Sequence, residues 1–337
     1  MNYYISKNYR HLGSGGDKAK TDIESILSSN GFINAGLPQG RSKNAIKAYL
    51  TTLFSVLKGV SVLKQGDVLV LQYPLKKYYD FVVSMAEKRG AKVITLIHDL
   101  GSFRRKKLTV EEEIKRLNRS YAIVVHSPSM LEWLKNHGIT TRMVILGMWD
   151  YLSPAQPATP IKSDSSRPRL VFAGDVSPKA NGWIYRLAEN DPDVDLILYG
   201  GNIDRSQKTP NMIDMGFVES DTLIASAQGD YGIVWYGSSL DEGAGPLGDY
   251  LQYNAPHKTS LYIRAGLPVI IWEKAALAPI VTQLGVGIAV PSLRDISKTL
   301  AKVTPQQYAD MQRNAAAVAR QLSSGYFFTK ALHEALR

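Results

Sequence analysis

The 337-residue chain contains no cysteine. This absence excludes a disulfide framework, zinc sites built on thiolates and cysteine nucleophiles, and it is typical of proteins in a reducing cytoplasm. No stretch approaches about 18 uninterrupted apolar residues, so the chain predicts no membrane-spanning helix. Its first residues, MNYYISKNYRHLG, lack the apolar run of a signal peptide. We therefore expect a cytoplasmic protein.

Metal-binding patterns are missing as well. The sequence shows no paired histidines at ligand spacing. We therefore expect no bound metal and no other cofactor.

Acidic residues are scarce in the first half of the chain. Residues 1–167 carry 25 Lys and Arg but 13 Asp and Glu, whereas the remaining residues carry 15 against 17. The basic excess predicts an anionic partner for the first half: nucleic acid, a phosphorylated lipid carrier or the negative face of a membrane. Because no nucleic-acid-binding module is recognisable, we expect no specific nucleic acid partner.

Short apolar runs alternate with helical patterns in both halves. Nearly continuous apolar runs such as Asp67–Gln72, Lys92–Ile97 and Pro268–Trp272 predict buried parallel strands with helices on both faces of the sheet. The length favours two domains of about 150 residues each. We therefore expect an α/β protein with two Rossmann-like domains, whose strands direct their carboxyl ends towards a central cleft where ligands bind.

A proline- and serine-rich stretch, SPAQPATPIKSDSSR at 153–167, divides the two halves. Its composition and lack of periodicity predict a linker. The first domain is then expected at 1–152 and the second at 168–322. The last segment, 323–337, is expected to form a helix that packs back on the first domain.

Two loops of the first half carry candidate functional residues. Gly15, Gly16 and Asp17 lie between the first strand and the first helix, where glycines and helix N–H groups suit an anion or a sugar hydroxyl, unless the segment is a plain turn. His98 and Asp99 end the run KVITLI, and either is a candidate general base. The alternative is that Asp99 caps a turn over His98. Arg104 opens a basic run that is either a solvated loop or a site for a pyrophosphate or anionic lipid.

Strand ends of the second half supply further candidates. Gly174 and Asp175, with Lys179 shortly after, follow the strand LVFA and suit a diphosphate or a simple turn. A carboxylate beside a diphosphate is unfavourable, so we expect Asp175 to bond backbone N–H groups or sugar hydroxyls. The other strand-end residues suited to a base or ribose pocket are Tyr199, Gly200 and Phe217.

The strongest signal follows the strand YGIVW. Asp241 and Glu242 lie in a glycine-rich acidic loop, and the segment NAPHKTS then opens a helix. At that helix start, backbone N–H groups, hydroxyls and an ammonium can together neutralise a diphosphate leaving group without a metal. The residues concerned are His257, Lys258, Thr259 and Ser260.

The stretch GDYLQYNAPHKTSLYIRAGLPVIIWEKAAL, at 248–277, resembles bacterial β-1,6-galactofuranosyltransferases of O-antigen assembly. It is similar, more distantly, to the glucosyltransferase that adds the second sugar to serine-rich-repeat adhesins. The segments LIHDLGSFR, ILGMWDY, FAGDVSPK and SSGYFFTKAL fall in the matching order. The resemblance implies the two-Rossmann-domain GT-B fold, a UDP-sugar donor and no metal requirement.

The resemblance also implies roles for individual residues. Lys258 and Thr259 would hold the diphosphate, Asp241 and Glu242 would approach the donor sugar or ribose, and Asp99 would face the acceptor. The rings of Tyr199 and Phe217 would flank the uracil. Retaining GT-B enzymes carry two glutamates eight positions apart before a G-x-P-V turn. The second is missing here, which favours inversion.

The sequence thus predicts a hexosyltransferase that uses a UDP-sugar and a glycan acceptor, with galactofuranose favoured and glucose open. Whether the acceptor is lipid-linked, whether the basic half contacts an anionic membrane, and whether the chain forms a homo-oligomer all stay open. Two alternatives also stay open, namely a non-catalytic GT-B-like subunit that partners a transferase and a nucleotide-sugar epimerase.

Overall fold

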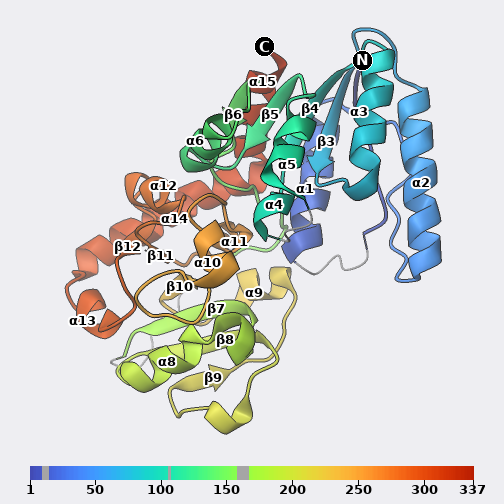
Figure 1. The fold of residues 1–337 in the computed structure, drawn as a ribbon. Helices are drawn as coiled ribbons and strands as arrows, with labels where there is room; N and C mark the ends of the chain where they lie inside the picture. Colours follow the sequence, from blue (N-terminus) through green and yellow to red (C-terminus); the bar gives the residue numbers. More distant parts are fainter. Residues whose placement is uncertain (10–14, 105–107, 158–166) are drawn as a thin grey trace. The chain divides into compact units, whose positions relative to one another are not determined.

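The computed structural model describes residues 1–9, 15–104, 108–157 and 167–337 (Figure 1). The chain divides into two compact units. Unit 1 contains Met1–Asp150 and Gly325–Arg337, and unit 2 contains Tyr151–Ser324. The final helix therefore belongs to unit 1 although it follows unit 2 in the sequence.

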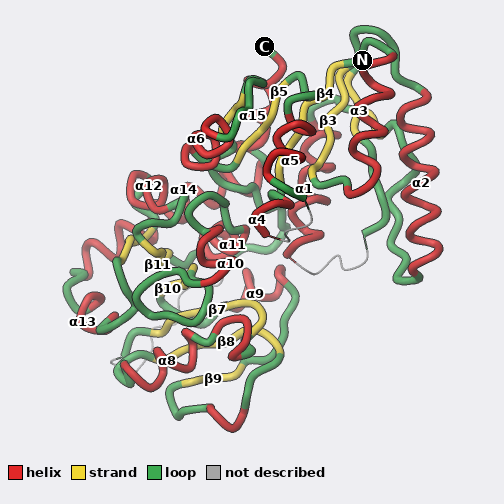
Figure 2. Tube along the Cα trace, viewed as in Figure 1, coloured by secondary structure: helices red, strands yellow, loops and turns green. Residues whose placement is uncertain are grey.

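Unit 1 is built on a parallel six-stranded sheet in the order β2-β1-β3-β4-β5-β6. Every residue of β5 is buried, as expected for a strand covered on both faces, and Figure 2 shows the strands of this unit among helices. In chain order the elements are β1 (Asn2–Tyr4), α1 (Gly15–Ser29), β2 (Ile33–Asn34), α2 (Ala45–Ser61), β3 (Val68–Tyr73), η1 (Lys76–Tyr78), α3 (Tyr79–Lys88), β4 (Lys92–Ile97), α4 (Gly101–Arg104), α5 (Val110–Leu117), β5 (Ala122–Val125), α6 (Pro128–Asn136), β6 (Met143–Ile145) and α15 (Tyr326–Leu336).

Unit 2 repeats the plan with a parallel sheet in the order β12-β11-β10-β7-β8-β9. Both β10 and β11 are buried along their whole length. In chain order the elements are β7 (Arg169–Asp175), α7 (Pro178–Asn181), α8 (Trp183–Asn190), β8 (Asp195–Gly201), η2 (Arg205–Gln207), β9 (Met212–Asp214), α9 (Ser220–Ser226), β10 (Tyr231–Val234), α10 (Gly245–Tyr250), α11 (His257–Arg264), β11 (Val269–Trp272), α12 (Ala278–Gln283), β12 (Gly287–Val290), α13 (Ile296–Leu300) and α14 (Pro305–Ser324).

The expected linker at 153–167 lies largely outside the described residues. Its first residues are held by the buried Arg264 of α11. The Arg264 guanidinium donates hydrogen bonds to the carbonyl oxygens of Tyr151 (3.2 Å), Ser153 (2.8 Å) and Ala155 (3.0 Å). The chain that enters unit 2 is thus fixed to α11, the helix that also carries Lys258.

Asp150 ties the last helix to the rest of unit 1. Its carboxylate accepts hydrogen bonds from the backbone N–H groups of Phe327 (3.1 Å) and Phe328 (2.7 Å), at the start of α15. Gly325 precedes that helix with a φ of 76°, a left-handed conformation that glycine adopts without strain. Asp150 therefore serves as the acceptor that the first amides of α15 require.

Asp150 should make stability depend on pH. Burial raises the pKa of this carboxyl to about 7. Above pH 4 the unfolded chain has released the proton that the folded chain still binds, so the folded state loses stability as the pH rises through 7. Between pH 5 and pH 8 we expect the unfolding free energy of the wild type to fall by roughly 2–3 kcal/mol relative to Asp150→Asn. Urea denaturation at both pH values measures this, and a pH-independent difference would contradict it.

Candidate functional site

The first candidate cluster lies in unit 2, where β7 and β8 end side by side on glycines. Gly174 and Gly200 are paired in the parallel register. A Cβ atom on Gly200 would lie 1.8 Å from the carbonyl oxygen of Gly174, and Gly174 itself has a φ of 146°. Both positions therefore require glycine, and the strand ends present backbone rather than side chains.

Lys258 lies against this glycine edge. Its Nζ atom is 3.8 Å from the centroid of the Phe172 ring and 5.1 Å from that of Tyr236. A Cβ atom on Gly174 would approach the same Nζ to 2.7 Å. Burial lowers the pKa of Lys258 to about 7, although the charge of Asp175 opposes this shift. An anionic ligand at this position would raise the pKa of Lys258 by stabilising its charged form, and it would form an ion pair with the resulting ammonium group.

Asp175 forms the polar border of the cluster. Its Oδ1 atom accepts hydrogen bonds from the backbone N–H of Ser177 (3.0 Å) and from the amide of Asn202 (3.2 Å). These bonds lower the pKa of the carboxyl, with the Ser177 backbone contributing most. Asp175 thus bonds a backbone N–H, one of the two kinds of partner predicted for it. Lys179, in α7, has an exposed side chain.

The start of α11 adds unsatisfied polar groups. Among the residues that the structure describes, the buried Thr259 Oγ1 and Asn254 Oδ1 atoms have no hydrogen-bond partner. Such a group costs about 1–3 kcal/mol unless a ligand or water satisfies it. Ser260 is buried beside Thr259, and the His257 ring stacks on Tyr151 with centroids 4.5 Å apart. Together with the helix N-terminus, these groups suit an anion.

Two predicted members of the nucleotide pocket differ in exposure. Tyr199 is 4% exposed, and its hydroxyl accepts a hydrogen bond from the backbone N–H of Gln228 (3.1 Å). Its ring therefore packs in the core of unit 2, which does not fit the prediction that it flanks a base. Phe217 is 68% exposed after β9, so its ring is accessible to a ligand.

Asp241 and Glu242, which are predicted to approach the donor sugar or ribose, lie in the acidic loop after β10. Asp241 forms a two-pronged ion pair with Arg294, with distances of 2.6 Å and 2.8 Å, and this pair lowers the pKa of Asp241. Both side chains line a separate hollow of about 370 Å³ with Arg186 and Glu189. Glu242 is exposed. Asp241 is therefore committed to Arg294 in this structure.

The second cluster lies in unit 1, at the carboxyl end of β4. His98 is held from two sides, since its Nε2 atom lies 2.7 Å from Gln72 Oε1 and its ring stacks on Trp149 with centroids 4.6 Å apart. The Trp149 ring also contacts the ring of His126, which is buried. Burial lowers the pKa of His126 to about 4. The contact with Gln72 engages only one ring nitrogen of His98, so both His98 and Asp99 stay candidates for the base.

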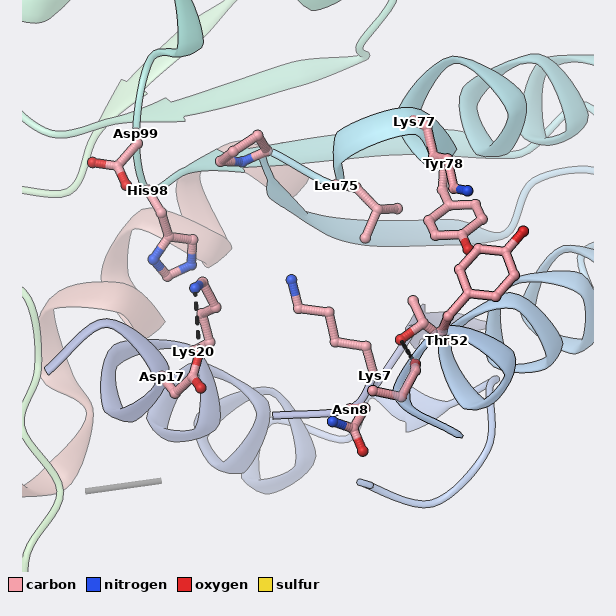
Figure 3. Close-up of a pocket in the computed structure, with 13 residues that line it drawn as sticks. Lys7, Asn8, Asp17, Lys20, Thr52, Leu75, Lys77, Tyr78, His98 and Asp99 are labelled. Carbon is pink, nitrogen blue, oxygen red and sulfur yellow. Dashed lines mark hydrogen bonds and ion pairs between the residues drawn. The ribbon is translucent and has the colours of Figure 1, made fainter. Parts of the chain in front are cut away.

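His98 and Asp99 border a hollow of about 610 Å³. Figure 3 shows them on one side of it, Lys77 and Tyr78 on the other, and Lys7 extending between. The hollow thus combines a carboxylate, aromatic faces and ammonium groups, which suit a sugar that carries an anionic group. The lining residues are Lys7, Asn8, Asp17, Lys20, Ala48, Tyr49, Thr52, Pro74, Leu75, Lys77, Tyr78, His98 and Asp99.

Of the predicted loop residues Gly15, Gly16 and Asp17, it is Asp17 that lines this hollow. Gly15, Gly16 and Asp17 form the first turn of α1 rather than a loop, and Asp17 pairs with Lys20 across 3.6 Å. Arg104 ends α4, but its side chain and the basic run at 105–107 lie outside the described residues.

Glu113, which the sequence did not single out, fixes the turn after Asp99. This buried carboxylate accepts hydrogen bonds from the N–H groups of Gly101 (2.7 Å) and Ser102 (2.9 Å) and from the Tyr73 hydroxyl (2.6 Å). It thereby joins the ends of β3 and β4, which both border the hollow. Its position within an ordinary acidic helix turn, VEEEIKRL, gave no signal of this role.

Replacing Glu113 with Gln should shift Asp99, the predicted base, by disturbing the turn at Gly101 and Ser102. The new amide group presents N–H donors to N–H donors, so we expect about 2–4 kcal/mol of lost stability and a roughly tenfold fall in kcat. The KM for the donor should stay unchanged. Glu112→Gln, at an exposed capping box, is the matched control. A folded Glu113→Gln protein with full kcat would refute the positioning role.

No group of three or more His, Cys, Asp or Glu side chains arranged for a metal ion occurs within residues 1–9, 15–104, 108–157 and 167–337. Within the same ranges, no helix has the length and apolar character to cross a bilayer.

Both units match models of the same protein family. A family model described as the N-terminal domain of glucosyltransferase 3-like proteins matches residues 2–148, and the corresponding C-terminal domain model matches residues 170–335. The β-1,6-galactofuranosyltransferase WbbI of Escherichia coli K12 is 26% identical over 97% of this chain and 95% of its own length. Glucosyltransferase 3 of Streptococcus gordonii is 27% identical over 80% of this chain and 79% of its own length.

A solved structure agrees with this fold. Anabaena HepE in complex with UDP and glucose matches 99% of this chain and 98% of its own, with a TM-score of 0.58 and 15% identity. At that identity the likeness concerns the fold alone. The predicted GT-B class, with two parallel sheets and their helices, is confirmed.

Proposed function

Because the chain belongs to the glucosyltransferase 3-like family of glycosyltransferases, we propose that it transfers a hexose from a UDP-sugar to a glycan acceptor. The observation that carries the proposal is the Lys258 ammonium, which lies against Gly174 where β7 ends. The relatives named above transfer galactofuranose or glucose by name, and HepE holds UDP and glucose.

The donor diphosphate binds at the start of α11 in this proposal. Lys258, the helix amides and the Thr259 hydroxyl neutralise the charge that develops on UDP as the glycosidic bond breaks. Since burial brings the pKa of Lys258 to about 7, diphosphate binding takes up a proton above that pH. Donor affinity is therefore expected to weaken as the pH rises past 7.

The acceptor hydroxyl meets Asp99 in this proposal. Asp99 takes the hydroxyl proton, the oxygen bonds to the anomeric carbon from the face opposite UDP, and the bond from that carbon to the diphosphate breaks. UDP leaves with the electron pair of that bond. A single displacement of this kind inverts the anomeric centre, and Lys258 with the amides of α11 supplies the charge neutralisation that a metal could otherwise give.

We favour galactofuranose as the transferred hexose, with glucose as the alternative, because of the relatives' names. The Lys7, Lys20 and Lys77 ammonium groups of the unit 1 hollow favour an acceptor with an anionic group, such as a pyrophosphate-linked lipid carrier. The same basic half would then lie near an anionic membrane surface.

A donor screen tests the proposal. The protein is incubated in EDTA with UDP-galactofuranose, UDP-glucose or UDP-galactose, each with and without a mixture of bacterial surface glycans. We expect UDP release that depends on the acceptor and a product of inverted configuration by NMR. Conversion of one UDP-sugar into another without acceptor would instead indicate an epimerase. Neither turnover nor UDP binding by folded protein would indicate a non-catalytic subunit.

A further inference from the structure

One face of α2 exposes apolar side chains. Ile46 is 71% exposed, Phe54 55%, and Leu50 and Leu57 are each 42% exposed. At roughly 100° of rotation per helical residue, these four side chains share an arc of about 80°. Scattered apolar residues are normal on a surface, but a continuous stripe marks a binding face. Figure 1 shows α2 along the outer edge of unit 1.

The stretch of sequence that contains α2 carries charge of one sign. From residue 25 to residue 66 the sequence contains no Asp or Glu. All five cations of this stretch have exposed side chains: Arg41, Lys43, Lys47, Lys58 and Lys64. Lys47 lies within α2, and its side chain borders a groove of about 470 Å³ together with Ile46, Leu50 and Phe54. Lys47 and the apolar stripe therefore share one surface.

The apolar stripe and the neighbouring positive charge together indicate the kind of partner that α2 binds. An amphipathic helix with apolar side chains beside cations is suited to the boundary between lipid headgroups and acyl chains. A second copy of the same face fits less well, because a two-fold contact would bring the Lys47 side chains of two α2 helices together, and α2 itself carries no carboxylate. A nucleic acid would leave the apolar stripe without a role.

The helix also connects this surface to the candidate acceptor site. Ala48, Tyr49 and Thr52, on another side of α2, line the hollow that contains Asp99. Lys77 extends over the Tyr49 ring at 4.2 Å. One helix thus lines the hollow and carries the apolar stripe, so a substrate anchored in a bilayer would reach the hollow over a short path.

We propose that α2 docks unit 1 on an anionic bilayer, with Ile46, Leu50, Phe54 and Leu57 entering the headgroup region and the surrounding cations contacting lipid phosphates. This inference rests on the proposed glycosyltransfer to a lipid-linked acceptor, which it deepens by naming the docking element.

Flotation with vesicles tests the docking. The full chain is mixed with vesicles of phosphatidylcholine alone or with about 30 mol % phosphatidylglycerol at low salt. We expect binding only to the anionic vesicles, and at least a tenfold lower partition coefficient for Leu50→Gln/Phe54→Gln. The matched control is Ile213→Gln/Leu247→Gln, which removes two exposed apolar side chains from unit 2 and should bind as the wild type does. Lys47→Glu should also weaken binding and make it less sensitive to salt.

The outcomes separate this inference from the proposed function. UDP binding by calorimetry should be equal in the wild type and in Leu50→Gln/Phe54→Gln, since neither side chain belongs to unit 2. Wild-type protein that binds UDP but not anionic vesicles overturns the docking proposal alone. An oligomer that Leu50→Gln/Phe54→Gln converts to monomers in light scattering, with vesicle binding unchanged, shows that a second copy covers α2 instead.

Discussion

Replacing Lys258 with Ala is expected to lower kcat for sugar transfer by about 10²–10³-fold. The substitution removes the ammonium that lies against the end of β7 at Gly174. Nothing else in the described cluster supplies a positive side chain at that glycine, so the developing charge on UDP would lose its strongest donor. Steady-state kinetics with the best donor of the screen measures the effect.

Lys208→Ala is the control for this experiment, because it removes an exposed lysine from the same unit and should leave turnover unchanged. Gly174→Ala is the complementary variant. Its Cβ would collide with the Lys258 ammonium, so the activity should fall although the lysine is still present. Full activity in Lys258→Ala would place the diphosphate elsewhere.

Replacing Asp99 with Asn should lower kcat by about 10²–10⁴-fold, because an amide cannot take the proton of the acceptor hydroxyl. UDP affinity should not change, because the diphosphate is assigned to unit 2. Single-turnover measurements with saturating donor and acceptor isolate this step from binding. Loss of kcat with intact UDP binding is the expected pattern.

Asp80→Asn is the matched control for Asp99, since it changes a half-exposed aspartate of unit 1 that pairs with Arg116. If His98→Gln abolishes transfer while Asp99→Asn does not, the histidine is the base and the assignment within the pair is reversed. Both variants should fold, because neither residue belongs to the buried core.

The strands of the sheets were the most predictable part of the fold. The predicted strand at Lys92–Ile97 agrees with β4 at both ends, because a short, nearly continuous apolar run is typical of a strand that is buried on both faces. The start of α2, at Ala45, is fixed by a local signal. There Asn44 caps it, accepting hydrogen bonds from the N–H groups of Ile46 and Lys47 (both 3.0 Å).

Other elements were missed for identifiable reasons. The strand β12 (Gly287–Val290) is four residues long, and its stability comes from pairing with β11 rather than from its own pattern. The helix α8 (Trp183–Asn190) has no side-chain cap and follows a glycine, so its start carries no local signal. Tertiary contacts decide both elements.

Residues of the candidate site could be predicted only where they lie at the end of a strand or at the start of a helix. Lys258 and Gly174 follow from that rule and lie together in the structure. Tyr199 lies near the end of β8, yet its hydroxyl accepts a hydrogen bond from the N–H of Gln228. Its place near a strand end does not tell which face of the sheet its ring occupies. Glu113 acts across the fold on Gly101 and Tyr73, and Asp241 is captured by Arg294. Such long-range pairs leave no local pattern.

The central claim, a UDP-sugar site in unit 2 that depends on Lys258, is tested most directly by isothermal titration of the intact protein with UDP in EDTA, with NAD as the comparison nucleotide. We predict micromolar UDP binding that is absent for NAD and lost in Lys258→Ala. At pH 8, buffers of different ionisation enthalpy should reveal proton uptake on binding, because the pKa of Lys258 lies at about 7. Folded wild-type protein that does not bind UDP, or Lys258→Ala that binds it equally well, would contradict the account.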